Sequence, residues 1–139
     1  MTARVCATFC VLLVAGCASS PPALPRNVSV GATVHRWPAP AVAPSGAAPA
    51  ILAVSFSSLD VARGGIWRGR FVTSTNVKSL VVRSNLFAIN VPRLSAGRFA
   101  FTLNVFDIPP IFLRAYRVRV IASNRYGVTT EEDVPFRIR

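Results

Sequence analysis

The chain has 139 residues and a formal net charge of +11, from 16 Lys and Arg against 5 Asp and Glu. This length holds one small domain plus a targeting or linker segment. One histidine, His35, and five carboxylates are too few to assemble a nucleophile–base pair, an acid–base pair or a metal site, so the sequence predicts a non-enzymatic protein with no catalytic residues, metal or cofactor.

The first seventeen residues are typical of a targeting segment. Arg4 supplies one positive charge, and an apolar run follows from Val5 to Val14. Ten residues rise only about 15 Å as a helix, half the hydrocarbon thickness of a bilayer. Residues 1–16 are therefore predicted to be a secretory signal peptide and not a membrane span.

The run ends in Val14-Ala15-Gly16-Cys17, which resembles the lipobox of bacterial lipoproteins. The resemblance implies cleavage between Gly16 and Cys17 and lipidation of Cys17 by diacylglycerol and a third acyl chain of the palmitate kind. Because Ala18 follows the cysteine in place of an aspartate, it also implies the periplasmic face of the outer membrane. In a host with one membrane, the same protein would sit on the outer leaflet of the cell membrane.

The alternative is an ordinary signal peptide, cut after Gly16 or Ala18, with a soluble product. Cys6 and Cys10 would be removed with the signal, leaving Cys17 as the only cysteine. A lone thiol in an oxidising compartment is a liability that lipidation removes, so the cysteine count favours the lipoprotein interpretation and excludes an intrachain disulfide.

Residues 17–50 are predicted to be the lipidated N-terminus and a linker. Seven of the 33 residues from 18 to 50 are proline, which interrupts helices and central strands. A chain of this length spans about 30 Å when flexible and about 100 Å when polyproline-like. We therefore expect the domain to lie some tens of ångströms above the lipid.

Residues 28–37 are less plainly linker, because apolar and polar residues alternate weakly there. We favour a plain linker over a short strand docked on the domain edge or an extended recognition segment with Trp37 exposed. His35 is expected to be a solvated linker residue, since no second ligand-type residue lies near it.

Residues 51–139 change to alternating aliphatic and aromatic residues separated by turn residues. Seven strands at a spacing near ten residues predict an all-β domain, an immunoglobulin-like antiparallel β-sandwich. The expected strands lie at 51–57, 65–74, 78–84, 86–91, 98–106, 114–123 and 128–138.

The segment from Ala115 to Gly127 has the pattern Tyr-x-Val-x-Val-x-Ala-x-Asn-x-x-Gly. This pattern resembles the penultimate strand and following turn of fibronectin type III and intermediate-type immunoglobulin domains. The resemblance implies that Tyr116 forms the corner hydrogen bond and that Val118 occupies the place of the second disulfide cysteine. Trp67 resembles the core tryptophan of the fibronectin type.

Fourteen arginines and one lysine follow Cys17, so almost all of the positive charge survives processing. Arg68 and Arg70, and likewise Arg117 and Arg119, are two residues apart and therefore share one face of a strand. These four are the candidate surface for an anionic ligand such as lipopolysaccharide phosphate, a capsular polysaccharide or peptidoglycan carboxylates. Solubility alone is the alternative, which we favour for the charge as such.

The acidic triplet Glu131-Glu132-Asp133 is expected to be a solvated cluster that partly neutralises neighbouring arginines, because its spacing does not make a calcium loop. Nucleic acid is not expected as a partner, since an envelope lipoprotein rarely meets it. The leading functional prediction is a lipid-anchored envelope module that contacts an anionic polymer or a protein. The alternative is an accessory subunit of a secretion or surface-appendage machine with one dedicated protein partner.

Overall fold

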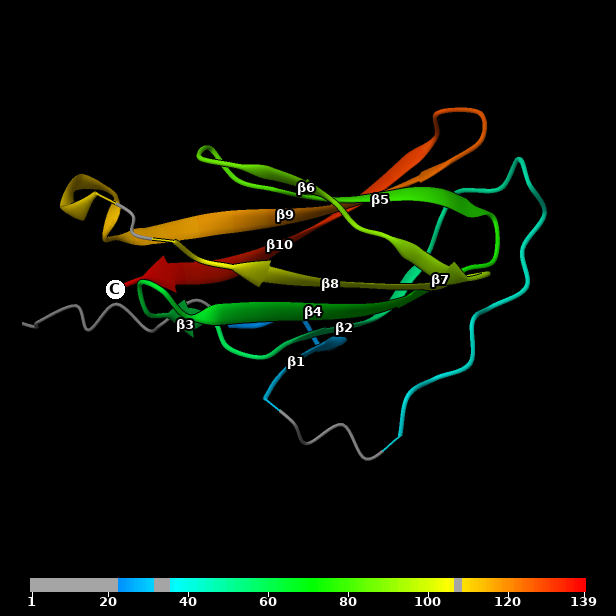
Figure 1. Ribbon diagram of the computed structural model, residues 1–139. Helices are drawn as coiled ribbons and strands as arrows, with labels where there is room; N and C mark the ends of the chain where they lie inside the picture. Colours follow the sequence, from blue (N-terminus) through cyan, green and yellow to red (C-terminus); the bar gives the residue numbers. More distant parts are fainter. Residues whose placement is uncertain (1–22, 32–35, 107–108) are drawn as a thin grey trace, which may run out of the picture.

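The computed structural model describes residues 23–31, 36–106 and 109–139. The predicted signal peptide, Gly16, Cys17 and His35 lie outside these residues. The described chain forms two sheets of five strands that face each other (Figure 1). Sheet A contains, in spatial order, β1 (Val28–Val30), β2 (Ile51–Phe56), β4 (Ile66–Thr73), β8 (Arg98–Asn104) and β7 (Arg93–Ser95). Sheet B contains β3 (Asp60–Val61), β10 (Thr129–Ile138), β9 (Ala115–Asn124), β5 (Val77–Arg83) and β6 (Ala88–Asn90), and a 3-10 turn, η1 (Pro110–Phe112), precedes β9.

This strand order is that of an immunoglobulin-like sandwich. The strands β2, β4, β8 and β7 take the A, B, E and D places, and β5, β9 and β10 take the C, F and G places. All seven predicted strands are present, and the all-β prediction is confirmed. Three further strands, β1, β3 and β7, have only two or three residues each, too few to show a period of two in the sequence.

The centre of the sandwich is a cluster of aromatic rings around Trp67, which is 1% exposed. The indole ring centroid lies 5.1 Å from that of Phe56, 5.0 Å from that of Phe101 and 4.5 Å from that of Phe136. The indole Nε1 donates a hydrogen bond to the Ser58 carbonyl at 3.0 Å, so its polar atom is satisfied. The structure thus has Trp67 in the core, as the resemblance implies.

Close packing in this cluster explains Gly69 on β4. A Cβ atom at this position would collide with the Phe101 ring on β8, directly across the strand pair. The glycine leaves the space that the ring fills.

Tyr116 makes the corner hydrogen bond that the resemblance implies. Its hydroxyl donates to the Phe112 carbonyl at 2.8 Å. The Arg114 Nε donates to the same hydroxyl at 3.2 Å, and the guanidinium lies 5.3 Å from the centre of the Tyr116 ring. Val118, 1% exposed, lies in the core at the position expected for it. These contacts fasten the start of β9 to the turn that precedes it.

The turn between β9 and β10 is organised by Asn124, whose Oδ1 accepts hydrogen bonds from the backbone N–H groups of Tyr126 and Val128. Gly127 supplies the positive φ of +81° that the turn requires. The Asn124 Nδ2 donates to the Ala47 carbonyl at 3.0 Å and so reaches beyond the turn, into the segment before β2.

That contact belongs to a larger departure from the sequence prediction. Residues 28–30 form β1, which pairs in parallel with residues 54–56 of β2, and Val28 packs against the core. Our preference for a plain linker is therefore wrong here, and the docked-strand alternative is correct. The physical reason is that β1 covers the edge of β2, whose backbone polar groups would otherwise lack strand partners.

The segment before β2 is also part of the domain. The Asn76 Nδ2 donates to the carbonyls of Pro44 and Ala47 at 3.0 and 2.8 Å, and the Ala50 N–H donates to the Ser74 Oγ at 2.8 Å. Pro49 is buried. Prolines exclude a central strand, as expected, but the Pro44 and Pro49 carbonyls still accept hydrogen bonds from the side chains of Asn76 and Thr130. The predicted linker over 17–50 is thus corrected for its described part, and the folded unit begins well before residue 51.

The N-terminal segment is also tied to sheet B through Asn27. Its Nδ2 donates to the Ile51 carbonyl at 3.1 Å and to the Glu132 Oε2 at 2.7 Å. Burial raises the pKa of the Glu132 carboxyl above its usual range, an effect that the hydrogen bond from Asn27 only partly offsets. The hydrogen-bonded link from sheet A to sheet B through Asn27 therefore includes a titratable group, the Glu132 carboxyl.

This pKa shift predicts a pH dependence of stability. Between the unfolded and the folded pKa of Glu132, the folded state holds more protons, so the free energy of unfolding falls as pH rises through that window. Glu132→Gln removes the titration and keeps an oxygen to accept from Asn27. Denaturant unfolding from about pH 4 to pH 7 is expected to show wild type losing stability relative to the variant as pH rises. Parallel pH profiles would contradict the assignment.

Candidate functional site

The outer face of sheet A carries exposed arginines on its two central strands. Arg68 and Arg70 alternate with buried residues on β4, and Arg98 stands on the neighbouring strand β8. Their cross-strand partners are small or aliphatic: Arg68 pairs with Thr102, Arg70 with Ala100 and with Ser55, and Arg98 with Val72. The side chains directly beside these arginines are therefore short and uncharged.

This face has no acidic counterpart. The five strands of sheet A contain no Asp or Glu and four arginines, namely Arg68, Arg70, Arg93 and Arg98. Within the described part of the chain, none of the four forms an ion pair. Apart from the Arg93 Nε, which donates to the Ser95 carbonyl at 3.3 Å, their donors are available to a ligand with phosphate or carboxylate groups. Arg68, Arg70 and Arg98 share the outer face, whereas Arg93 pairs with the inward-facing Phe99. We call the first three residues, with the strands that hold them, the arginine face.

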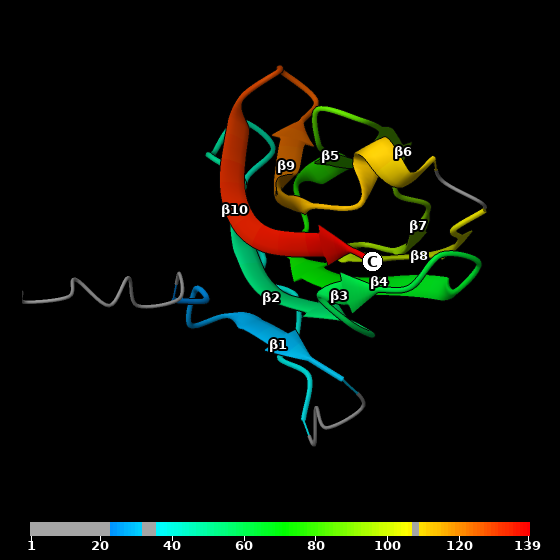
Figure 2. The same ribbon diagram turned by 90° about the vertical axis from the view of Figure 1, so that its left-hand side faces the viewer.

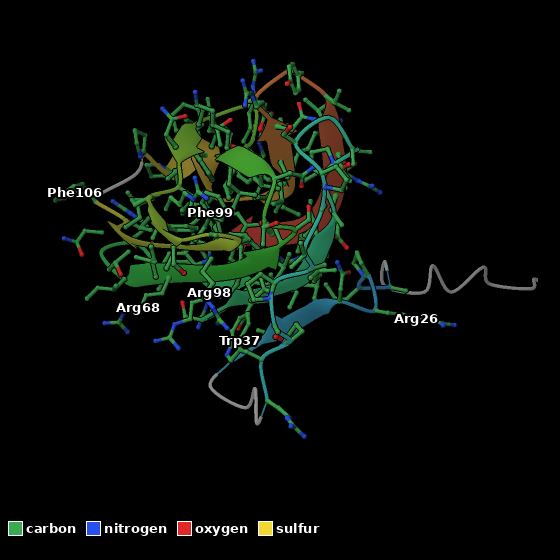
Figure 3. The ribbon with its side chains drawn as sticks, turned by 90° about the vertical axis from the view of Figure 1, so that its right-hand side faces the viewer. Arg26, Trp37, Arg68, Arg98, Phe99 and Phe106 are labelled. Carbon is green, nitrogen blue, oxygen red and sulfur yellow. The ribbon has the colours of Figure 1, made fainter. Side chains whose placement is uncertain are left out.

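Trp37 lies on the same side of sheet A as Arg68 and Arg98 (Figure 3). It is half-buried, and so is Pro40 just after it, which packs against the tight turn at Gly97 between β7 and β8. The sequence offered Trp37 as an exposed recognition residue in one alternative. The structure instead gives it a partly covered place beside the arginine face.

The other two predicted arginines lie elsewhere. Arg117 and Arg119 are on β9, on the outer face of sheet B, so the structure does not bring them together with Arg68 and Arg70. Arg119 contacts Asp133 at 3.1 Å and Glu131 at 3.2 Å, and Arg117 lies 4.0 Å from Asp133. Exposed pairs of this kind contribute little to stability, about 0–1 kcal/mol, but they reduce the charge offered to a ligand.

The acidic triplet explains this difference between the sheets. Glu131 and Asp133 neutralise arginines on β9, as predicted, whereas Glu132 points to the other side of β10 and binds Asn27. The strands of sheet B hold five cations and four acids: Lys78, Arg83, Arg117, Arg119 and Arg137 against Asp60, Glu131, Glu132 and Asp133. Without Glu132, the strands of sheet B still hold three acids, two of which pair with arginines on β9, whereas the strands of sheet A hold none.

Sequence reasoning missed Arg98. Its signal was present, because Phe99 and Phe101 follow at a period of two with the opposite orientation and are buried. What the sequence lacked was the pairing of β8 with β4, which places Arg98 beside Arg70 and Arg68.

An apolar cavity of about 390 Å³ was also not predicted. It lies at one end of the sandwich, and its lining includes Trp67, Phe87, Leu103, Phe106 and Phe112. Phe106 at its rim is 77% exposed, as is nearby Ile111. Exposed aromatic and aliphatic groups beside an apolar hollow are typical of contacts with other apolar surfaces.

Over residues 23–31, 36–106 and 109–139, no group of three or more His, Cys, Asp or Glu side chains is placed to hold a metal ion. In the same residues, no helix is long and apolar enough to cross a membrane. Comparison with protein-family models and with curated proteins finds no match. The candidate site therefore rests on its own geometry and charge.

Proposed function

We propose that this chain is a non-enzymatic, lipid-anchored protein of the cell envelope whose immunoglobulin-like domain binds an anionic envelope polymer through the arginine face. The observation that carries the proposal is the charge of sheet A. Its strands hold four arginines and no acid, and none of these arginines forms an ion pair with a described residue. The proposed location in the cell envelope is supported by the lipobox resemblance at Val14-Ala15-Gly16-Cys17.

The geometry of a strand suits a repeating ligand. Arg68 and Arg70 are two residues apart and so about 7 Å apart along β4. Arg98 pairs with Val72, so it lies one strand away from Arg70, about 5 Å across the sheet, and about 7 Å further along it. The planar guanidinium forms paired hydrogen bonds with phosphate or carboxylate groups. A polymer that carries such groups at regular intervals, like a phosphorylated or uronic polysaccharide, can contact several arginines at once.

A second candidate is a protein partner in a secretion or surface-appendage machine. It is favoured by the apolar cavity and by the exposed Phe106 at its rim, since protein contacts are centred on apolar and aromatic groups. This partner would use the end of the sandwich and not the arginine face, so the two candidates are separable by mutation.

Polymer binding predicts a specific loss in the variant Arg68→Gln/Arg70→Gln/Arg98→Gln. Retention on immobilised lipopolysaccharide or acidic polysaccharide is expected to weaken steeply with salt and to fall at least about tenfold in the variant, since each arginine near an anionic surface contributes about 1 kcal/mol. The matched control is Arg117→Gln/Arg119→Gln, which removes paired arginines from sheet B and is expected to retain binding. Equal retention of the triple variant and wild type would leave solubility as the role of these arginines.

The anchor is tested separately by Cys17→Ser. In the native chain, metabolic labelling with a fatty acid and membrane fractionation are expected to show a labelled, membrane-bound protein. The variant is expected to lose the label and to leave the membrane fraction, because no other cysteine follows residue 17. Unchanged processing and membrane attachment of the variant would contradict the lipoprotein assignment.

A further inference from the structure

The described chain begins beside β10, at one edge of the sandwich (Figure 2). Ala23, its first residue, lines a surface cavity of about 600 Å³ together with Arg117 on β9 and Pro135 and Arg137 on β10. From there the backbone passes through Asn27, which binds Glu132, into β1. The N-terminal end of the folded unit is thus at the β10 edge, away from the centre of the arginine face.

Only five residues, 18–22, separate Cys17 from Ala23. A fully extended chain advances at most about 3.6 Å per residue, so the Cα atoms of Cys17 and Ala23, six steps apart, are no more than about 22 Å apart. This reach is much shorter than that of the linker expected from the sequence. A lipid on Cys17 would therefore hold the β10 edge close to the membrane surface.

The surroundings of Ala23 hold both charges, since Asp133 lines the same cavity as Arg117 and Arg137, and Asp60 is the register partner of Arg137. Arg26, Arg117 and Arg137 are all exposed, and Arg26 and Arg137 have no ion pair within the described residues. The Arg117 guanidinium is 4.0 Å from Asp133, a carboxylate that Arg119 binds more closely, at 3.1 Å. Figure 3 shows Arg26 on the side of the domain away from Arg68 and Arg98.

We propose that the β10 edge rests on the phosphate-bearing headgroups of the anchoring membrane, with Arg26 and Arg137, which have no ion pair among the described residues, in contact with them. The inference rests on the lipidation of Cys17 proposed above. In this orientation β7, at the far end of sheet A, points away from the lipid, so Arg93 and Arg98 remain free for a polymer. The opposite orientation would require the short tether to cross the width of the sheet, about 5 Å for each strand.

This orientation can be tested on the native chain, because the reactivity of its own arginines depends on their contact with lipid. The lipidated chain is placed in vesicles of phosphatidylethanolamine and phosphatidylglycerol and treated with phenylglyoxal, and the rate at each arginine is read by mass spectrometry. Relative to the soluble Cys17→Ser chain, Arg26 and Arg137 are expected to react at no more than about one fifth of the rate, as phosphate contacts of about 1 kcal/mol imply. Arg93 and Arg98 are expected to keep their rates. Unchanged rates at Arg26 and Arg137, or protection of Arg93 and Arg98, would overturn the proposal.

The same spectra separate this inference from the proposed anchor. The mass of the N-terminal peptide shows whether Cys17 carries lipid, and its absence there would contradict the proposed function. In that event the orientation is measured on the chain from Cys17 onward, coupled through this single thiol to a maleimide phospholipid. Protection at the β10 edge then supports the geometry, and uniform reactivity contradicts it.

Discussion

The aromatic cluster around Trp67 is the interaction on which the rest of the structure depends. The sequence has no cysteine after residue 17, so the two sheets are held together mainly by packing, without the disulfide that antibody domains place between them. Trp67, Phe56, Phe101 and Phe136 join strands from both sheets, and the indole also binds the Ser58 carbonyl. Large rings bury more area than any aliphatic side chain, which suits a small core.

A small core also explains the role of the N-terminal segment. β1 covers the edge of β2, and the backbone around Pro44 and Ala47 accepts hydrogen bonds from the half-buried Asn76 and the buried Asn124. Each such hydrogen bond stabilises by about 1 kcal/mol, and an unmade one costs more when the group is buried. A segment rich in proline thus contributes to the domain through its carbonyl groups, and its position sets how far the domain lies from residue 17.

The sequence was sufficient for the seven main strands, for Trp67 and for the Tyr116 corner, because alternation over six or more residues and a specific turn pattern are local signals. It was not sufficient for β1, whose three residues fold only against β2, nor for the contacts of residues 41–50, whose partners are more than twenty residues away in the chain. For the same reason, the sequence could not show that the four arginines predicted as one candidate surface lie on different sheets. Arg68 and Arg117 both follow period two, and only the assignment of β4 and β9 to different sheets separates them.

The most direct test of the account is the free energy of unfolding of residues 23–139 compared with that of residues 51–139. The contacts of β1, Asn76 and Asn124 predict that the shorter chain loses at least about 2 kcal/mol or does not fold, since buried groups lose their partners. Equal stability of the two chains would show that the N-terminal segment is a linker after all, and would remove the geometric basis for placing the β10 edge at the membrane.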